Sequence, residues 1–203
     1  FLSEVDYRLF ADNIDWRVVQ DQSHNNYSIK QLNKKLIIPT RDEQAGKVIC
    51  DLFKSTGRSS GILFSPGIAH ARHISGTLRM FGLTCEIIAS EIDPRECALN
   101  LSRFRKGLID IAITIDMFNE GVDVPNVDMI VFMRATHSRR IFIQQLGRGL
   151  RVSPQKDKVL VMDFVSDIRR VAEVVNLDSS IKSQEIEKVG LGRHLIDFDD
   201  KSS

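Results

Sequence analysis

Two arginines in the segment FIQQLGRGLR, residues 142–151, have the types and spacing needed to bind an anion. Arg148 and Arg151 are three positions apart, so on a helix they share one face. Gly147 and Gly149 flank the first of them, although each glycine costs a helix about 1 kcal/mol relative to alanine. The spacing is equally compatible with two surface ion pairs and with a paired cationic clamp for a phosphate chain.

A second polar segment, TIDMFNEGVDVP at residues 114–125, places acidic side chains around a glycine. One interpretation, which the spacing alone favours, is a solvated acidic turn with Gly121 at a positive φ angle. The other is a site where the backbone at Gly121 approaches a ligand closely while Asp123 holds a hydroxyl group or an arginine. Both interpretations stay open at this point.

Short apolar runs alternate with helical patterns and must position these two segments. Two helix starts carry capping signals: Thr40 with Glu43, and Asp93 followed by Pro94 and Glu96. The expected strands are residues 62–64, 84–89, 110–115, 128–133 and 158–165, and the expected helices are 41–55, a stretch ending at 80, 94–106, one from 138 and one after 165. Continuous apolar strands predict coverage on both sides, hence a three-layer α-β-α fold with a parallel central sheet.

In a parallel α/β sheet, ligands bind at loops beyond the carboxyl ends of the strands. The loops after Ile115 and Met133 leave the predicted sheet at such ends. We therefore expect the acidic-glycine loop and the arginine-bearing helix to lie side by side, as a half-site for a nucleoside triphosphate.

Composition narrows the classes of function. The chain has 28 basic and 27 acidic residues, so its net charge of +1 gives no global sign of a nucleic-acid partner, and any basic surface must be local. Three cysteines without a CxxC pair predict reduced, partly buried thiols in a cytoplasmic protein. No apolar run has the roughly 20 residues of a membrane span. His70 and His73 lack the companions of a metal site, so we expect no metal and interpret them as surface or half-buried side chains.

The chain begins at Phe1 and is interpreted as a piece of a longer protein. Residues 1–40 have mixed character and predict a linker or arm from a preceding domain. Residues 41–170 form the predicted α/β domain, and residues 171–203 a C-terminal helix with a frayed tail.

Three segments carry a resemblance to a known family: GILFSP, TIDMFNEGVDVPNVD and QQLGRGLR. In order and spacing they resemble motifs IV, V and VI of superfamily-two helicases, across about residues 62–163. The most similar branch holds the bacterial excision-repair helicase subunit, the repair helicases of the transcription apparatus, and the motors of type I and type III restriction enzymes. The implied fold is the second RecA-like domain, a P-loop NTPase fold without its own Walker A motif.

The resemblance also implies roles for individual residues. Arg151 matches the arginine finger, Arg148 matches the other γ-phosphate-facing arginine, and Gln144 heads the same motif. The implied nucleotide neighbours are Gly121, Asp123 and Gly147. The implied contacts with the nucleic-acid backbone are Thr114, Ser65 and Pro66, to which we add Ser90 and Arg95 as candidates.

A complete motor also needs Gly-x-x-x-x-Gly-Lys-Ser/Thr to hold phosphates and Mg²⁺, and no Gly-Lys-Ser/Thr occurs. The sequence AGK at 45–47 is followed by valine inside a predicted helix, and Asp42-Glu43 is interpreted as part of a helix cap. We therefore expect a shared ATP site whose Mg²⁺ is held mainly by a missing N-terminal RecA-like domain, so that this chain alone is inactive. DNA is the expected nucleic acid, with RNA not excluded. The alternatives are a catalytically silent RecA-like binding or scaffolding module, and the motor part of a restriction-type endonuclease.

Overall fold

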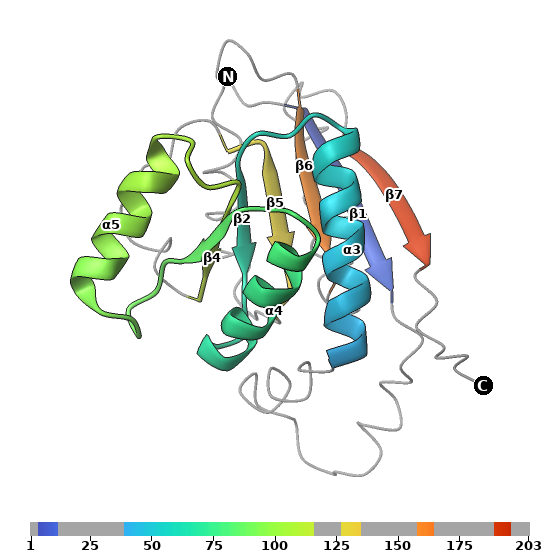
Figure 1. Cartoon of the computed structure of the whole chain (residues 1–203). Helices are drawn as coiled ribbons and strands as arrows, with labels where there is room; N and C mark the ends of the chain where they lie inside the picture. The colour runs from blue at the N-terminus through green and yellow to red at the C-terminus, as the bar shows by residue number, and fades with distance from the viewer. Residues whose placement is uncertain (1–3, 12–38, 116–126, 135–157, 165–188, 196–203) are drawn as a thin grey trace, which may run out of the picture.

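The computed structural model describes residues 4–11, 39–115, 127–134, 158–164 and 189–195. Within these ranges, seven strands form one sheet in the order β3-β4-β2-β5-β6-β1-β7, and every neighbouring pair is parallel (Figure 1). The strands are β1 (Glu4–Ala11), β2 (Gly61–Phe64), β3 (Cys85–Ile87), β4 (Ile111–Thr114), β5 (Met129–Phe132), β6 (Lys158–Asp163) and β7 (Val189–Leu195).

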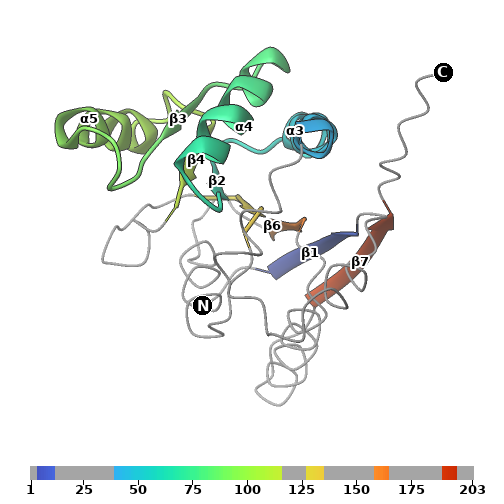
Figure 2. The same cartoon turned by 90° about the horizontal axis from the view of Figure 1, so that it is seen from below.

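Helices pack against both faces of this sheet. On one face, α3 (Pro39–Ser55) and α4 (Ile68–Met80) share an apolar cluster with alternate strand residues such as Leu63. On the other, α5 (Pro94–Arg105) contributes Cys97 and Phe104 to a second cluster that contains Ile62. Figure 2 shows α3 and α4 side by side, with α5 at the β3 end of the sheet. The predicted three-layer fold with a parallel sheet is confirmed.

Of the two predicted helix caps, the structure contains one. At α5 the Asp93 side chain accepts hydrogen bonds from the amides of Arg95 (2.8 Å) and Glu96 (3.2 Å), and Pro94 occupies the first turn, as predicted. The predicted cap at Thr40 is wrong, because α3 already begins at Pro39. Proline suits the first position of a helix, where its missing N–H has no partner to lose.

Strand β1 lies where the sequence predicted a connector. It pairs with β6, and its Phe10 ring stacks on Phe164 with centroids 4.7 Å apart. Strand β7 pairs with β1 inside the segment predicted as a helix and frayed tail. Both strands depend on partners far away in the sequence, which local patterns do not report. The predicted helices from 138 and after 165 lie outside the described residues, and the domain boundaries stay a prediction.

Candidate functional site at the carboxyl edge of the sheet

The carboxyl ends of four strands lie level with one another. The register pairs Phe64, the last residue of β2, with Thr114 at the end of β4 and with Phe132 at the end of β5. Phe132 is paired in turn with Asp163, which ends β6. The loops that follow these strands therefore leave the sheet along one line, which we call the carboxyl edge.

The strand order corrects one expectation from the sequence. The loops after β4 and β5 were expected to be direct neighbours, but β2 lies between these two strands. The reason is that the chain passes from β4 over β2 to β5, so neighbours in sequence are not neighbours in the sheet. The turn at residues 65–67 consequently lies between the starting points of segments 116–126 and 135–157.

Arg134 connects those two starting points directly. It follows β5, and its Nη1 donates a hydrogen bond to the backbone carbonyl of Ile115, which follows β4. Since β2 separates the two strands, the Arg134 side chain reaches across the end of β2. Ile115 and Arg134 are the last described residues before segments 116–126 and 135–157.

Ser65 begins the turn after β2, and its side chain is enclosed. It has 0% exposure. Its Oγ lies 2.8 Å from His70 Nδ1 and 3.0 Å from the carbonyl oxygen of Gly67, while its amide donates to the carbonyl of Thr114 at 2.8 Å. The structure thus joins two predicted nucleic-acid contacts, Ser65 and Thr114, through the backbone. The Ser65 hydroxyl itself faces the protein interior.

The interpretation of His70 as a surface or half-buried side chain is wrong, because His70 is buried and forms a polar pair with Asp42. His70 Nε2 lies 3.2 Å from Asp42 Oδ1, and the two side chains are 1% and 0% exposed. Asp42 belongs to the first turn of α3 rather than to a cap. The signal for His70 was its helical spacing, because Ile74 and Leu78 follow at four-residue intervals on the same buried face. His73, with 42% exposure, matches the predicted surface role.

Several buried polar atoms at this edge have no hydrogen-bond partner among the described residues. They are Asp42 Oδ2, Gln44 Oε1 and Thr114 Oγ1. His73 Nε2 lies 3.7 Å from Asp42 Oδ2, which is too far for a hydrogen bond. A buried polar atom left without a partner costs about 1–3 kcal/mol, so it is expected where function requires it.

Ser90 and Arg95 lie apart from this group. Ser90 follows β3, which is separated from β2 by β4, and its exposed hydroxyl bonds to Glu91 Oε2 at 3.1 Å. Arg95 is exposed in the first turn of α5. A cavity of about 440 Å³ opens nearby between α4 and α5, lined by residues of both charges that include Arg72 and Glu96. Such a mixed lining shows no preference for a phosphate.

The remaining predicted site residues lie outside the described part of the chain. They are Gly121, Asp123, Gln144, Gly147, Arg148 and Arg151. Their roles stay predictions. What the structure shows is that the segments containing them begin at the carboxyl edge, on either side of the turn at residues 65–67.

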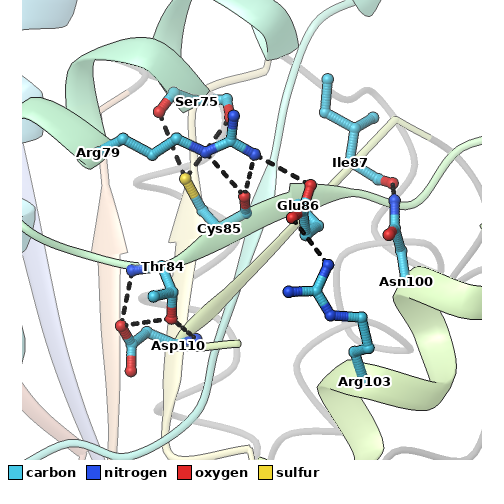
Figure 3. Close-up of polar contacts among 9 residues, drawn as sticks. All are labelled: Ser75, Arg79, Thr84, Cys85, Glu86, Ile87, Asn100, Arg103 and Asp110. Carbon is cyan, nitrogen blue, oxygen red and sulfur yellow. Dashed lines mark hydrogen bonds and ion pairs between the residues drawn. The ribbon is translucent and has the colours of Figure 1, made fainter. Parts of the chain in front are cut away.

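At the opposite, amino edge of the sheet, the side chains of Asp128 and Asp110 accept hydrogen bonds. The Asp128 carboxylate accepts bonds from Ser59 N (2.9 Å), Ser59 Oγ (2.9 Å) and Ser60 N (3.1 Å). Asp110 accepts two bonds of 2.7 Å from the amide and the hydroxyl of Thr84, as Figure 3 shows. These contacts join the starts of neighbouring strands.

Strand β3, at one end of the sheet, is held by cations from two helices. Glu86 lies 2.9 Å from Arg79 Nη2 of α4 and 3.2 Å from Arg103 Nη1 of α5 (Figure 3). The Cys85 thiol beside them is buried, and burial raises its pKa, opposed by a hydrogen bond with Ser75 and by the charge of Arg79. Cys50, Cys85 and Cys97 are all free and buried, which confirms the predicted thiols.

The described residues do not form a cradle for a triphosphate. In the AGK segment, a Cβ atom added to Gly46 would lie 2.6 Å from Thr77 Cγ2, so this glycine serves the close packing of α3 on α4. Among the described residues no group of three or more histidine, cysteine or acidic side chains could hold a metal ion. The same residues contain no helix long and apolar enough to span a bilayer.

Sequence comparison finds relatives whose names describe helicases and a restriction enzyme. A Saccharomyces cerevisiae protein named as an ATP-dependent helicase, IRC3, is 31% identical over 106 residues, 52% of this chain and 15% of that protein. DEAD-box ATP-dependent RNA helicase 13 of Arabidopsis thaliana is 32% identical over 95 residues, 47% of this chain and 12% of that protein. An Escherichia coli type I restriction enzyme subunit, of EcoKI, is 25% identical over 152 residues, 68% of this chain and 13% of that protein. The chain thus spans less than a quarter of each relative.

Structural comparison supports the same fold. A fragment of an HsdR-type subunit of a type I restriction enzyme from Vibrio vulnificus YJ016 superposes with a TM-score of 0.64 and 20% sequence identity, covering 98% of this chain and 38% of that one. The family model for the helicase conserved C-terminal domain matches residues 44–153, more than half of the chain. This protein therefore belongs to the helicase conserved C-terminal domain family.

Proposed function

We propose that this chain is the second motor domain of an ATP-dependent superfamily-two helicase or translocase that acts on DNA. The observation that carries the proposal is the level carboxyl edge formed by β4, β2 and β5. From it start the segment with Gly121 and Asp123 and the segment with Arg148 and Arg151, joined at their starting points by Arg134. The segment with acidic residues around Gly121 therefore starts after β4, and the segment with the arginine pair starts after β5, with one strand between them.

In this proposal the chain lends positive charge to a triphosphate that a preceding RecA-like domain holds together with Mg²⁺. Arg151 would stabilise the charge that spreads over the γ-phosphoryl oxygens during transfer to water. Packing of Gly46 against Thr77 supports this division, because the GK dipeptide of this sequence lies in the interior of α3 and its glycine is used for helix contact.

The test uses the full-length protein and the substitution Arg151→Ala. Turnover of ATP should fall by about 10³–10⁵-fold, the range that arginine fingers contribute in phosphoryl-transfer enzymes. Arg151→Lys should not restore it, because an ammonium group does not reproduce the planar guanidinium fork. Arg105→Ala, at an exposed position in the last turn of α5, is the matched control and should leave turnover unchanged. Retained turnover in Arg151→Ala would refute the assignment.

DNA is proposed over RNA because the match with the EcoKI subunit extends over 68% of this chain, compared with 47% and 63% for the RNA helicases 13 of Arabidopsis and Oryza sativa. ATP hydrolysis by the full-length protein should be stimulated by duplex DNA and should lose that stimulation steeply as salt rises, since phosphate contacts release counterions. Stimulation by single-stranded RNA alone would assign the protein to RNA instead.

A second candidate, the motor of a restriction-type endonuclease, is favoured by the same EcoKI similarity. A restriction-type motor should displace a third strand from a DNA triplex in an ATP-dependent reaction without releasing the strands of the duplex. A helicase should release a labelled duplex strand. Measuring both reactions with one protein preparation separates the two candidates.

A further inference from the structure

Three buried side chains, Asp42, His70 and Ser65, form a hydrogen-bonded series at the carboxyl edge. It joins the first turn of α3, the first turn of α4 and the turn after β2. The three side chains have 0%, 1% and 0% exposure. Burying a polar group costs free energy unless it is hydrogen-bonded, whereas apolar side chains would fill the same space without this requirement. We therefore expect these three polar side chains to do more than fill the core.

The Ser65 hydroxyl donates its proton to a protein acceptor whether His70 is neutral or protonated. A carboxylate only accepts, so His70 Nε2 donates to Asp42. If His70 is neutral, its Nδ1 accepts the single hydroxyl proton of Ser65. If His70 is an imidazolium, Nδ1 donates to Ser65 Oγ, and the hydroxyl proton goes to the Gly67 carbonyl. The Gly67 carbonyl keeps the Ala71 amide, at 2.9 Å, in both cases.

This geometry excludes nucleophilic catalysis by the Ser-His-Asp set. In serine hydrolases the ring nitrogen that takes the serine proton is Nε2, and Nδ1 faces the carboxylate. Here the two nitrogens have exchanged partners. Ser65 is also fully enclosed, which leaves no space for an acyl group at its Oγ. The side chains therefore hold a position rather than react.

What they hold is the turn at residues 65–67. The Ser65 amide donates to the Thr114 carbonyl at 2.8 Å, so the same turn is fixed to the end of β4. Pro66 and Gly67 in the same turn are partly exposed. Thr114 Oγ1 beside it is buried without a hydrogen-bond partner among the described residues. Pro66 has no N–H and the Ser65 amide is already bonded, so the Gly67 amide is the backbone donor that this turn offers to a phosphodiester oxygen.

We propose that Asp42 and His70 are positioning residues that hold the Ser65–Gly67 turn in the orientation needed to receive a nucleic-acid backbone. This inference rests on the proposed function and extends it to two residues outside the motif segments. Asp42 acts through His70, and His70 acts through Ser65. The phosphodiester contacts the turn, and it does not contact Asp42 or His70.

The experiment measures nucleic-acid-stimulated ATP hydrolysis in the full-length protein for His70→Gln, Asp42→Asn and the milder Ser65→Ala. The concentration of DNA that gives half-maximal stimulation should rise about tenfold, while kcat at saturating DNA and the KM for ATP change by about twofold or less. Thermal melting identifies variants that fail to fold. Ser65→Ala keeps the backbone and is the variant to interpret if the other two unfold.

His73→Gln is the matched control. His73 lies on the same helix one turn further along and faces the same carboxylate, but at 3.7 Å from Oδ2 and with 42% exposure. It should leave the half-maximal DNA concentration unchanged. The double variant Asp42→Asn/Ser65→Ala should need no more DNA for half-maximal stimulation than the more affected of the two single variants. The effects of residues that act through the same hydrogen-bonded series do not add.

The outcomes separate this inference from the proposed function. If DNA stimulates the unmodified protein, His70→Gln and His73→Gln at the same concentration, this inference is overturned and the proposed function stands. A uniform loss of kcat with an unchanged DNA requirement also overturns it, since that result indicates a structural role. An unmodified full-length protein whose hydrolysis no nucleic acid stimulates overturns the proposed function and this inference together.

Discussion

At the amino edge of the sheet, the Asp128 carboxylate accepts three hydrogen bonds and Asp110 accepts two. At the carboxyl edge, Thr114 Oγ1 and Asp42 Oδ2 are buried with no hydrogen-bond partner among the described residues. Both edges belong to the same seven strands and were subject to the same packing constraints. The difference is that the amino edge has paired its acidic side chains, whereas the carboxyl edge keeps buried polar atoms that the described residues do not pair; under the proposed function their partner is a ligand.

The largest expected effect comes from paired arginine substitutions at the two edges of the full-length protein. Arg134→Met removes the contact with the Ile115 carbonyl at the carboxyl edge. Under the proposed function, kcat for ATP hydrolysis should fall about 10–100-fold, because a displacement of about 1 Å at a catalytic site can cost that much. Arg58→Met is the control, since Arg58 Nη1 donates to the Asp128 carbonyl (3.3 Å) at the amino edge. Equal kcat losses in both variants would break the comparison.

A second pair of substitutions should change stability in opposite directions. Asp128→Ala deletes three hydrogen bonds and should lower the free energy of unfolding by about 2–3 kcal/mol. Thr114→Val removes a buried hydroxyl without a partner and should raise it by about 1 kcal/mol. Urea denaturation of both variants measures the two changes. Destabilisation by Thr114→Val would show that the hydroxyl has a structural partner.

The helix layer offers a smaller, internally matched test at two glycines. Gly76→Ala, in the interior of α4 with open space around it, should stabilise by about 1 kcal/mol through helix propensity. Gly46→Ala gains the same propensity but brings a methyl group to 2.6 Å from Thr77 Cγ2, and overpacking costs about 1–3 kcal/mol. It should therefore be neutral to destabilising by about 2 kcal/mol. Thermal melts that show equal stabilisation would mean that α3 moves freely on α4.

The smallest expected effect is a pH dependence from buried thiols. Burial raises the pKa of Cys85 and of Cys97, so each thiol ionises at lower pH in the unfolded chain than in the folded one. Stability from this source is therefore complete below the ordinary thiol pKa and is lost as pH rises through the folded value. Urea midpoints should be flat from about pH 7 to 8 and decline in alkaline solution, less so in Cys85→Ala. A midpoint that rises there would contradict the assignment.

Much of the fold could be predicted because its central elements are locally encoded. The apolar strands around Ile62 and Ile113 are buried on both faces, and Asp93 with Pro94 marks a helix start in four residues. Strand β1 could have been detected from the alternation of Val5, Tyr7 and Leu9 with polar residues, but its pairing with β6 spans about three quarters of the chain. Pairing between strands so far apart in the sequence is decided by tertiary contacts.

The candidate site was predictable only in part for a related reason. Ser65 follows one predicted strand and Thr114 lies near the end of another, so their shared edge follows from a parallel sheet. The placement of β2 between β4 and β5 does not, because strand order is a property of the whole topology. Asp42 and His70 are 28 residues apart and meet only when α3 and α4 pack together.

The side chain of Arg134 has a mechanical implication. Neighbouring strands are about 4.8 Å apart, so its contact with the Ile115 carbonyl spans roughly two such spacings over the tip of β2. The backbones of β4 and β5 each pair with β2, so this side chain is a direct link between two strand ends that do not pair with each other. Under the proposed function, a shift at the end of one strand would be passed to the other by this side chain as well as through β2.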